Sequence, residues 1–264
     1  MKLATEKMLA RREGAIGWMT FNNPQRHNAL SLEMWQAMGE ILPAFQQDPA
    51  VRLVVMTGAG DKAFVSGADI SEFDDKRSSA EAAEEYARVS EGGRTALANF
   101  EKPLIAMIRG YCLGGGLATA LAADIRIAAE GAQFAIPAAR LGLGYGFAGV
   151  KVLNDLVGPA LAREILYTAR RLSAEEALRI GLINRLVPPA ELETTVRELA
   201  ESIAANAPLT IRAAKRAVGE ACRDPQDRDL AALEAMVAAC FDSADYAEGR
   251  LAFKEKRAPK FTGS

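Results

Sequence analysis

Two apolar runs that each end in a glycine constrain this 264-residue chain more than any other feature of its sequence. VRLVVMTG spans 51–58 and KPLIAMIRG spans 102–110, and neither alternates apolar with polar residues. Such runs are typical of strands buried on both faces, as in a parallel sheet covered by helices. Helical patterns occur at 31–45 and 74–100, so we expect an α/β protein.

The sheet is expected to begin early and the chain to end in helices. MLARREGAIGWMTFN (8–22) breaks at a Glu-Gly pair, which predicts a β-hairpin, and the stretches 124–130 and 133–136 predict two further strands. Toward the carboxy terminus the pattern becomes almost wholly helical. We therefore predict two parts, an α/β core over 1–190 and a helical carboxy-terminal region over 191–264.

Polar residues predict where three of the helices begin. Ser31 precedes the helical pattern at 31–45 and is a candidate N-cap, whose hydroxyl would accept a hydrogen bond from the first turn. SAEE (173–176) has the spacing of a capping box, and DYAE (245–248) is a similar Asp-x-x-Glu start.

Composition and charge argue against several classes of protein. Lys plus Arg number 32 against 34 for Asp plus Glu, so the net charge of −2 provides no electrostatic footprint for nucleic acid or for an anionic membrane. The charged segment 1–14 lacks the apolar stretch of a secretory signal, and no apolar run is long enough to span a bilayer. Cys112, Cys222 and Cys240 form no C-x-x-C pair, so we expect no disulfide framework and no metal site. These features predict a cytoplasmic protein.

Two strand-to-loop junctions stand out as candidate sites. KAFVSGADISEF (62–73) follows the first buried run, and GYCLGGGLATALAAD (110–124) follows the second. Each places small residues and a helix start at the carboxyl end of a strand, where open α/β sheets bind ligands. The N–H groups at such helix starts have no partner within the helix and could hold an anion or a developing oxyanion. Close packing of backbone on backbone is the alternative explanation for the glycines.

The order of several motifs resembles the crotonase (enoyl-CoA hydratase/isomerase) superfamily over nearly the whole chain. The motifs are NPQRHNALS (23–31), VVMTGAGDKAFVSGADI (54–70), KPLIAMIRGYCLGGGLATALAADIRIA (102–128), FAIPAARLGLG (134–144), AEEALRIGLINRLVP (174–188) and FKEKRAPKF (253–261). The resemblance implies a twisted ββα spiral with a carboxy-terminal helical region that packs a homotrimer or homohexamer. It also implies chemistry on an acyl-CoA thioester through its enolate, with CoA entering as part of the substrate and no separate cofactor.

The same resemblance assigns the candidate site residues. The backbone N–H groups of Ala68 and Gly115 correspond to the family's oxyanion hole. Residues that correspond to CoA contacts lie in the RHNAL segment, around the first junction and near the carboxy terminus on a neighbouring subunit. They are His27, Ala29, Ala63, Ser66, Ile70 and Lys256.

The chain departs from the family at the positions that transfer protons. Hydratases of the family carry glutamates where this chain has Ala118 and Ala138, and isomerases and dehalogenases carry an aspartate at the position of Gly146. Some decarboxylases carry a histidine at the position of Ala68. Because alanine and glycine side chains cannot activate water or protonate carbon, the usual hydratase mechanism is not expected here.

Tyr145 is the one polar side chain expected close to the reacting atoms. Its hydroxyl could donate a proton, as in similar methylmalonyl-CoA decarboxylase-like members, or its ring could only shape the acyl pocket. His27 is the only histidine and lies in the CoA-contact segment, which argues against a Ser-His-Asp hydrolase of the related protease fold.

Three functions remain open at this point. The first is an acyl-CoA thioester enzyme that resembles enoyl-CoA hydratase but has an atypical active site. The second is a malonyl-type acyl-CoA decarboxylase that uses Tyr145, and the third is a non-catalytic acyl-CoA-binding protein. RNA binding, as in one relative within the family, is not expected because the stretch 81–100 is not basic.

Overall fold

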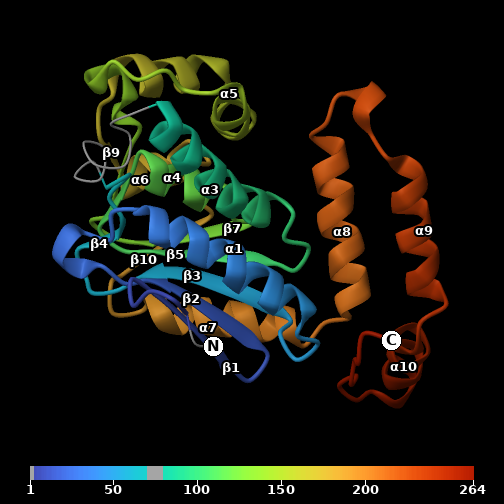
Figure 1. The fold of residues 1–264 in the computed structure, drawn as a ribbon. Helices are drawn as coiled ribbons and strands as arrows, with labels where there is room; N and C mark the ends of the chain where they lie inside the picture. Colours follow the sequence, from blue (N-terminus) through green and yellow to red (C-terminus); the bar gives the residue numbers. More distant parts are fainter. Residues whose placement is uncertain (1–2, 70–79) are drawn as a thin grey trace.

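The structure, a computed structural model, describes residues 3–69 and 80–264, and its central part repeats one unit of two strands and a helix (Figure 1). In each unit the first strand joins a large sheet, the second joins a small sheet, and a helix follows. The units are β3 (Leu53–Gly58), β4 (Ala63–Val65) and α3 (Ala80–Ala98); β5 (Leu104–Ile108), β6 (Tyr111–Leu113) and α4 (Gly115–Leu121); and β7 (Ile125–Ala129), β8 (Gln133–Ala135) and α5 (Phe147–Thr168). This arrangement confirms the ββα organisation expected from the resemblance.

The large sheet has six strands in the order β1-β2-β3-β5-β7-β10. β1 (Met8–Glu13) and β2 (Ile16–Phe21) form the antiparallel hairpin that the sequence predicts. β2, β3, β5, β7 and β10 (Arg185–Val187) run parallel to one another. The small sheet has the order β4-β6-β8-β9, in which only β9 (Leu172–Ser173) is antiparallel to its neighbour.

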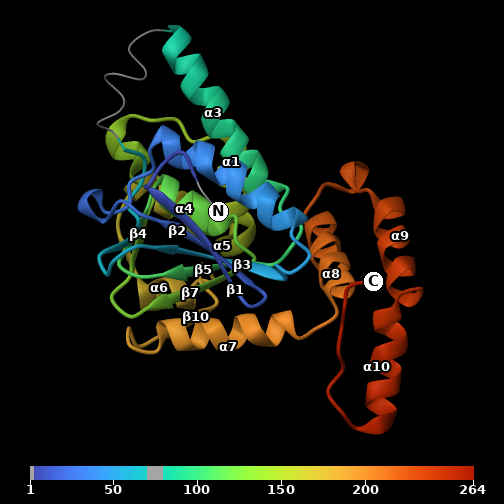
Figure 2. The ribbon, with the colours of Figure 1, turned by 60° about the horizontal axis from the view of Figure 1, so that its bottom comes forward.

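Both faces of the large sheet are buried, as the apolar runs predict. Along β3, Val54 and Met56 belong to the main core, which includes the buried face of α1 (Leu32–Gln47). Leu53 and Val55 point the other way, into a second cluster formed with α7 (Leu192–Ala204). Figure 2 shows α7 along one side of the strands, with α1 and α3 on the other. The absence of alternation in the sequence therefore reflects burial on two faces.

The last three helices stand beside the sheets as an arm (Figures 1 and 2). They are α8 (Pro208–Ala221), α9 (Leu230–Phe241) and α10 (Ala244–Glu255). The tail after α10 folds back: the buried carboxylate of Asp245 accepts hydrogen bonds from Thr262 N (2.6 Å) and Gly263 N (2.9 Å). Arg52, just before β3, donates to the Phe261 carbonyl (3.0 Å), so the tail connects the arm to the core.

The predicted helix starts are confirmed only in part. Ser173 and Glu176 form a complete capping box at the start of α6 (Ala174–Arg179). Ser31 occupies the N-cap position of α1, but its hydroxyl makes no capping bond. A helix does begin at DYAE, since α10 starts at Ala244, but the cap is Ser243, whose hydroxyl accepts from Tyr246 N (3.1 Å). Asp245 instead lies inside the helix and holds the tail.

The division of the chain at residue 190 stays a prediction. Helix α7 packs on the large sheet, while α8 to α10 form the arm. Strands β4, β6, β9 and β10 were not expected from the sequence as separate elements, and each is two or three residues long.

Candidate active site

The three glycines at 114–116 place the start of α4 directly against β4. Gly114 has φ 51° and ψ −118°, a conformation that side chains disfavour. At Gly116 there is no room for a Cβ, because the Val65 carbonyl group of β4 lies in its place. The glycines therefore serve both the turn and the close approach of a helix to a strand.

The other loop of the candidate site follows β4, and its backbone turns sharply at Gly67, where φ is 121°. Beyond this turn, Ala68 forms an isolated parallel bridge with Leu30. The bridge is made by Leu30 N to Gly67 O (2.7 Å) and by Asp69 N to Leu30 O (2.8 Å). Because a parallel bridge uses the residues on either side of Ala68, the N–H group of Ala68 itself points away from Leu30.

The two loops bring the amides of Ala68 and Gly115 together. A Cβ built on Gly115 would lie 3.8 Å from Ala68 N and 3.6 Å from Leu30 Cδ1. Gly115 is the first residue of α4, so its N–H group has no partner within the helix. Among residues 3–69 and 80–264, no acceptor pairs with either amide, and Ala68 is exposed. An amide of this kind is free to bind an acceptor atom of a ligand.

The positions at which the family carries its proton-transferring acids hold side chains here that cannot ionise. Ala118 lies on α4, and Ala138 belongs to the 3₁₀ helix Pro137–Leu141. This 3₁₀ helix begins against the turn, since a Cβ on Gly114 would lie 3.6 Å from Pro137 Cδ. Gly146 is the N-cap of α5.

Tyr145 lies in the loop before α5 and packs against the main core. A Cβ on Gly149, in the first turn of α5, would stand 2.8 Å from Tyr145 Cε1, so the ring rests on that turn. Burial raises the pKa of the Tyr145 hydroxyl, and the positive charge of Arg94 on α3 opposes this only in part. Tyr145 is therefore a phenol, able to donate a proton, at neutral pH.

The predicted CoA-contact residues fall into three groups. His27, Ala29, Ala63 and Ser66 come together, with Ser66 N donating to His27 O (3.1 Å) and the His27 ring edge-on to Tyr111 (5.8 Å between centroids). Lys256 is the C-cap of α10, and this helix lies on the far side of the core from β4 in both views (Figures 1 and 2). Ile70 lies outside the described residues.

One buried residue of this region was missed by the sequence reasoning. Asn28 is fully buried, and its side chain bonds to three backbone groups of neighbouring segments. Its position beside His27 in the RHNAL segment, and the ease with which asparagine adopts positive φ, are the signals that could have singled it out.

Neither a reactive cysteine nor a metal site adds to the chemistry of the described residues. Cys112 is buried, and burial raises the pKa of its thiol, so it is not a nucleophile. Across the ranges 3–69 and 80–264, no cluster of His, Cys, Asp and Glu could hold a metal ion.

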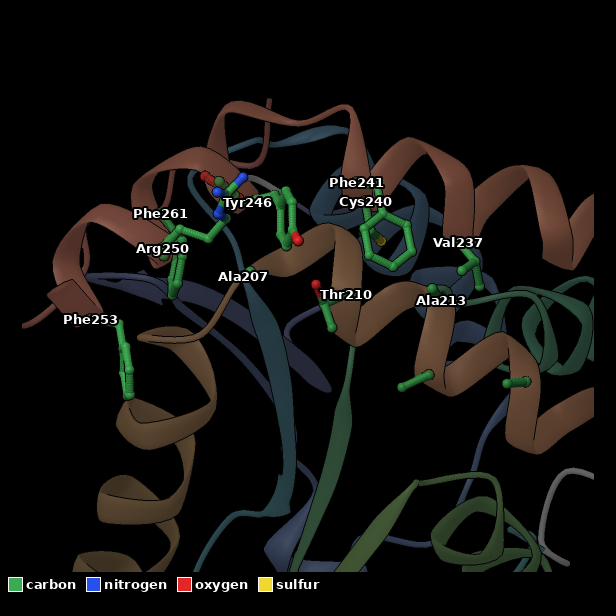
Figure 3. Close-up of a pocket in the computed structure, with 14 residues that line it drawn as sticks. Ala207, Thr210, Ala213, Val237, Cys240, Phe241, Tyr246, Arg250, Phe253 and Phe261 are labelled. Carbon is green, nitrogen blue, oxygen red and sulfur yellow. The ribbon is translucent and has the colours of Figure 1, made fainter.

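A large apolar groove lies away from the two amides, between α8, α9 and α10 (Figure 3). Its volume is about 720 Å³, and aromatic side chains of α9, α10 and the tail line it. Phe253 is 88% exposed and Phe241 is 61% exposed. A groove of this kind suits a protein surface better than a small polar substrate.

Comparison with known proteins identifies the class to which this fold and these loops belong. The profile of the enoyl-CoA hydratase/isomerase family matches residues 11–264. The chain belongs to this family, within the crotonase superfamily.

Several members are similar over nearly their whole length. A crotonyl-CoA hydratase of Syntrophomonas wolfei is 37% identical over 259 residues, which are 98% of this chain and 99% of that protein. A carnitinyl-CoA dehydratase of Escherichia coli O157:H7 is 37% identical, over 98% of this chain and 99% of that protein.

A solved structure confirms the fold. An enoyl-CoA hydratase/carnithine racemase from Magnetospirillum magneticum superposes with a TM-score of 0.91 at 37% identity, covering 99% of this chain and 97% of that one. Within the described parts of the chain, no helix is long and apolar enough to cross a membrane.

Proposed function

We propose that this protein is an acyl-CoA thioester enzyme that stabilises an enolate with the N–H groups of Ala68 and Gly115. The observation that carries the proposal is the meeting of these two amides at a turn and a helix start, as described above. As a thioester becomes an enolate, its carbonyl oxygen gains negative charge. Two fixed N–H donors bind this charged oxygen more strongly than the neutral carbonyl oxygen of the starting thioester. CoA enters as part of the substrate, and the reaction needs no separate cofactor.

The side chains around the amides favour a reaction that forms the enolate without a base. Ala118, Ala138 and Gly146 can neither remove an α-proton nor activate water. In a malonyl-type thioester, cleavage of the bond to the carboxylate releases CO₂ and leaves its electron pair on the α-carbon, which yields the enolate directly. Decarboxylation is therefore our candidate reaction.

Tyr145 supports this candidate as the source of the proton that follows. The enolate carbon must be protonated after CO₂ leaves, and a buried phenol with a raised pKa keeps its proton at neutral pH. Water can then restore the phenol. Hydration of an enoyl thioester is the reaction closest to the names of the relatives, and it would need an ordered water that no side chain activates.

A substrate panel tests the proposal. Purified protein is offered a crotonyl, a β-keto and a methylmalonyl thioester of CoA, and turnover and binding are both measured. We expect turnover of the malonyl-type thioester with release of CO₂. Turnover of crotonyl-CoA alone would identify a hydratase of unusual mechanism. Binding without turnover across the panel would identify an acyl-CoA-binding protein, and no binding at all would overturn the proposal.

We also propose that the protein assembles as a homotrimer or homohexamer through its arm. The exposed aromatic residues in the groove of Figure 3 support burial against another subunit. In such an assembly Lys256 would reach the CoA phosphates of a neighbouring subunit. Light scattering coupled to size exclusion would show three or six copies of the 28.2 kDa chain, and a monomer would contradict this.

A further inference from the structure

A buried asparagine joins the segment before α1 to the strand that leads to Ala68. Asn28 has 0% exposure and uses both ends of its carboxamide. Its Oδ1 accepts from Asn23 N (2.9 Å), and its Nδ2 donates to the carbonyl oxygens of Ala59 (3.0 Å) and Ala63 (2.8 Å). Both N–H donors of the side chain are therefore used, one at each end of the turn from β3 to β4.

The backbone around Asn28 is shaped to present this side chain. Asn28 has φ 56° and follows His27 with φ 52°, a left-handed conformation that asparagine tolerates better than most residues. Gly58 leaves room for this junction, because a Cβ there would overlap the carbonyl groups of Ala63 and Phe64 and lie 2.7 Å from Asn28 Nδ2.

Main-chain hydrogen bonds connect the segment that contains Asn28 to the loop that contains Ala68. Ser66 N bonds to His27 O and Leu30 N bonds to Gly67 O, so the segment 27–30 runs beside 66–69 like an added strand. β4 itself has only three residues, with an irregular register against β6. The direction of the Ala68 N–H group thus depends on how firmly the segment at 27–30 is held.

We propose that Asn28 is a positioning residue for the oxyanion hole. By fixing segment 27–30 to the start of β4, its carboxamide aims the N–H group of Ala68 at the oxygen that Gly115 also binds. The inference rests on the proposed function, since it assumes that the two amides stabilise an enolate. In this role Asn28 acts through the backbone of segment 27–30, because its carboxamide is fully buried and bonded to main-chain groups.

Two substitutions test this role in complementary ways. Asn28→Asp keeps the shape but cannot donate, so it faces the Ala59 and Ala63 carbonyls with a carboxylate. Asn28→Gly removes the side chain and suits the positive φ, which protects the fold. Asn22→Asp is the matched control, because Asn22 Nδ2 also donates to a carbonyl, that of Glu6 (2.8 Å), but at the exposed amino-terminal edge.

The readout is the acidity of a bound β-keto thioester, acetoacetyl-CoA, whose enolate is followed by near-ultraviolet absorbance as the pH is raised. Wild-type protein is expected to lower the pKa of the bound thioester relative to free acetoacetyl-CoA. In Asn28→Asp and Asn28→Gly this pKa should rise by about one unit or more, a roughly tenfold loss of enolate stabilisation. Butyryl-CoA forms no enolate under these conditions, so its neutral carbonyl oxygen gains little from the exact direction of the Ala68 N–H group. Its affinity should therefore change by less than about threefold.

The outcomes separate the inference from the function on which it rests. If wild-type protein leaves the pKa of acetoacetyl-CoA unchanged, the proposed oxyanion hole fails, and the role of Asn28 falls with it. If wild type lowers this pKa and the folded Asn28→Gly variant lowers it equally, the positioning role is overturned while the proposed function stands. Equal effects of Asn22→Asp and Asn28→Asp would also contradict the inference, because the effect would then not be specific to β4.

Discussion

Gly116 on α4 lies against the carbonyl group of Val65 on β4, so closely that no Cβ fits between helix and strand. This contact fixes the distance between the two loops that carry Ala68 and Gly115. The separation of the two amides is therefore set in part by the close packing of Gly116 on Val65.

Gly116→Ala tests this contact. The added methyl group must push α4 away from β4, and overpacking of this kind destabilises a fold by about 1–3 kcal/mol. Urea unfolding should show this loss for Gly116→Ala. Gly144→Ala is the control, because no atom lies within 4 Å of its added Cβ and its stability should stay close to wild type. Equal stability of the two variants would contradict the close contact.

Tyr145→Phe tests the proposed proton donor. If Tyr145 protonates the enolate, its removal should lower the rate of product formation about 10²–10⁴-fold, the usual contribution of a general acid. Since burial raises the pKa of Tyr145 above the ordinary value of about 10, wild-type activity should persist through neutral pH and decline only in strongly alkaline solution. A pH–rate profile of both proteins checks this. An unchanged rate in Tyr145→Phe would show that the hydroxyl donates no proton and that the ring only shapes the pocket.

The three cysteines predict an order of chemical labelling. Cys222 is exposed and should react first with a maleimide, followed by the half-buried Cys240. Cys112 is buried, and its raised pKa keeps it as the unreactive thiol, so it should react only after unfolding. Peptide mass spectrometry locates each label. Rapid labelling of Cys112 in the native protein would contradict the packing of β6.

Asp245→Ala tests whether the tail is held by a buried carboxylate. Loss of the bonds to Thr262 and Gly263 should cost about 1–3 kcal/mol of stability and speed hydrogen exchange in the tail. Asp242→Ala, at the exposed end of α9, should leave both unchanged. Protection of the tail amides in Asp245→Ala at wild-type levels would show that Arg52 and the other contacts suffice.

Much of the large sheet follows from local sequence, whereas in the small sheet only β8 was expected. The run at 51–58 predicts a strand buried on two faces, and the opposite directions of Val54 and Val55 in β3 explain its lack of alternation. The three residues of β4 or of β6 are too few to show a period, and their partners lie far away in the chain. Short strands therefore depend on tertiary contacts that local propensity does not record.

The candidate site shows the same division. The glycine cluster marks a helix start at a strand end, which local reasoning recognises, while Ala68 and Gly115 were assigned through family resemblance. Asn28 escaped both, because its partners Ala59 and Ala63 are 31 and 35 residues away in sequence. The role proposed for Asn28 depends on a three-dimensional junction, which its place in the RHNAL segment does not by itself reveal.

The central claim is that the N–H group of Gly115, together with that of Ala68, polarises a bound thioester. Gly115→Pro removes this N–H at the first position of a helix, where proline is well tolerated. Gly115→Ala is its matched control, because it adds a Cβ at the same place, 3.6 Å from the nearest side-chain atom, and keeps the N–H group.

The most direct measurement is the carbonyl stretching frequency of a ¹³C-labelled acyl-CoA thioester bound to each protein, recorded by isotope-edited infrared difference spectroscopy. Two hydrogen bonds should lower this frequency relative to the free thioester in wild type and in Gly115→Ala, and the shift should be largely lost in Gly115→Pro. An equal shift in Gly115→Pro and Gly115→Ala, or no shift in wild type, would contradict the account.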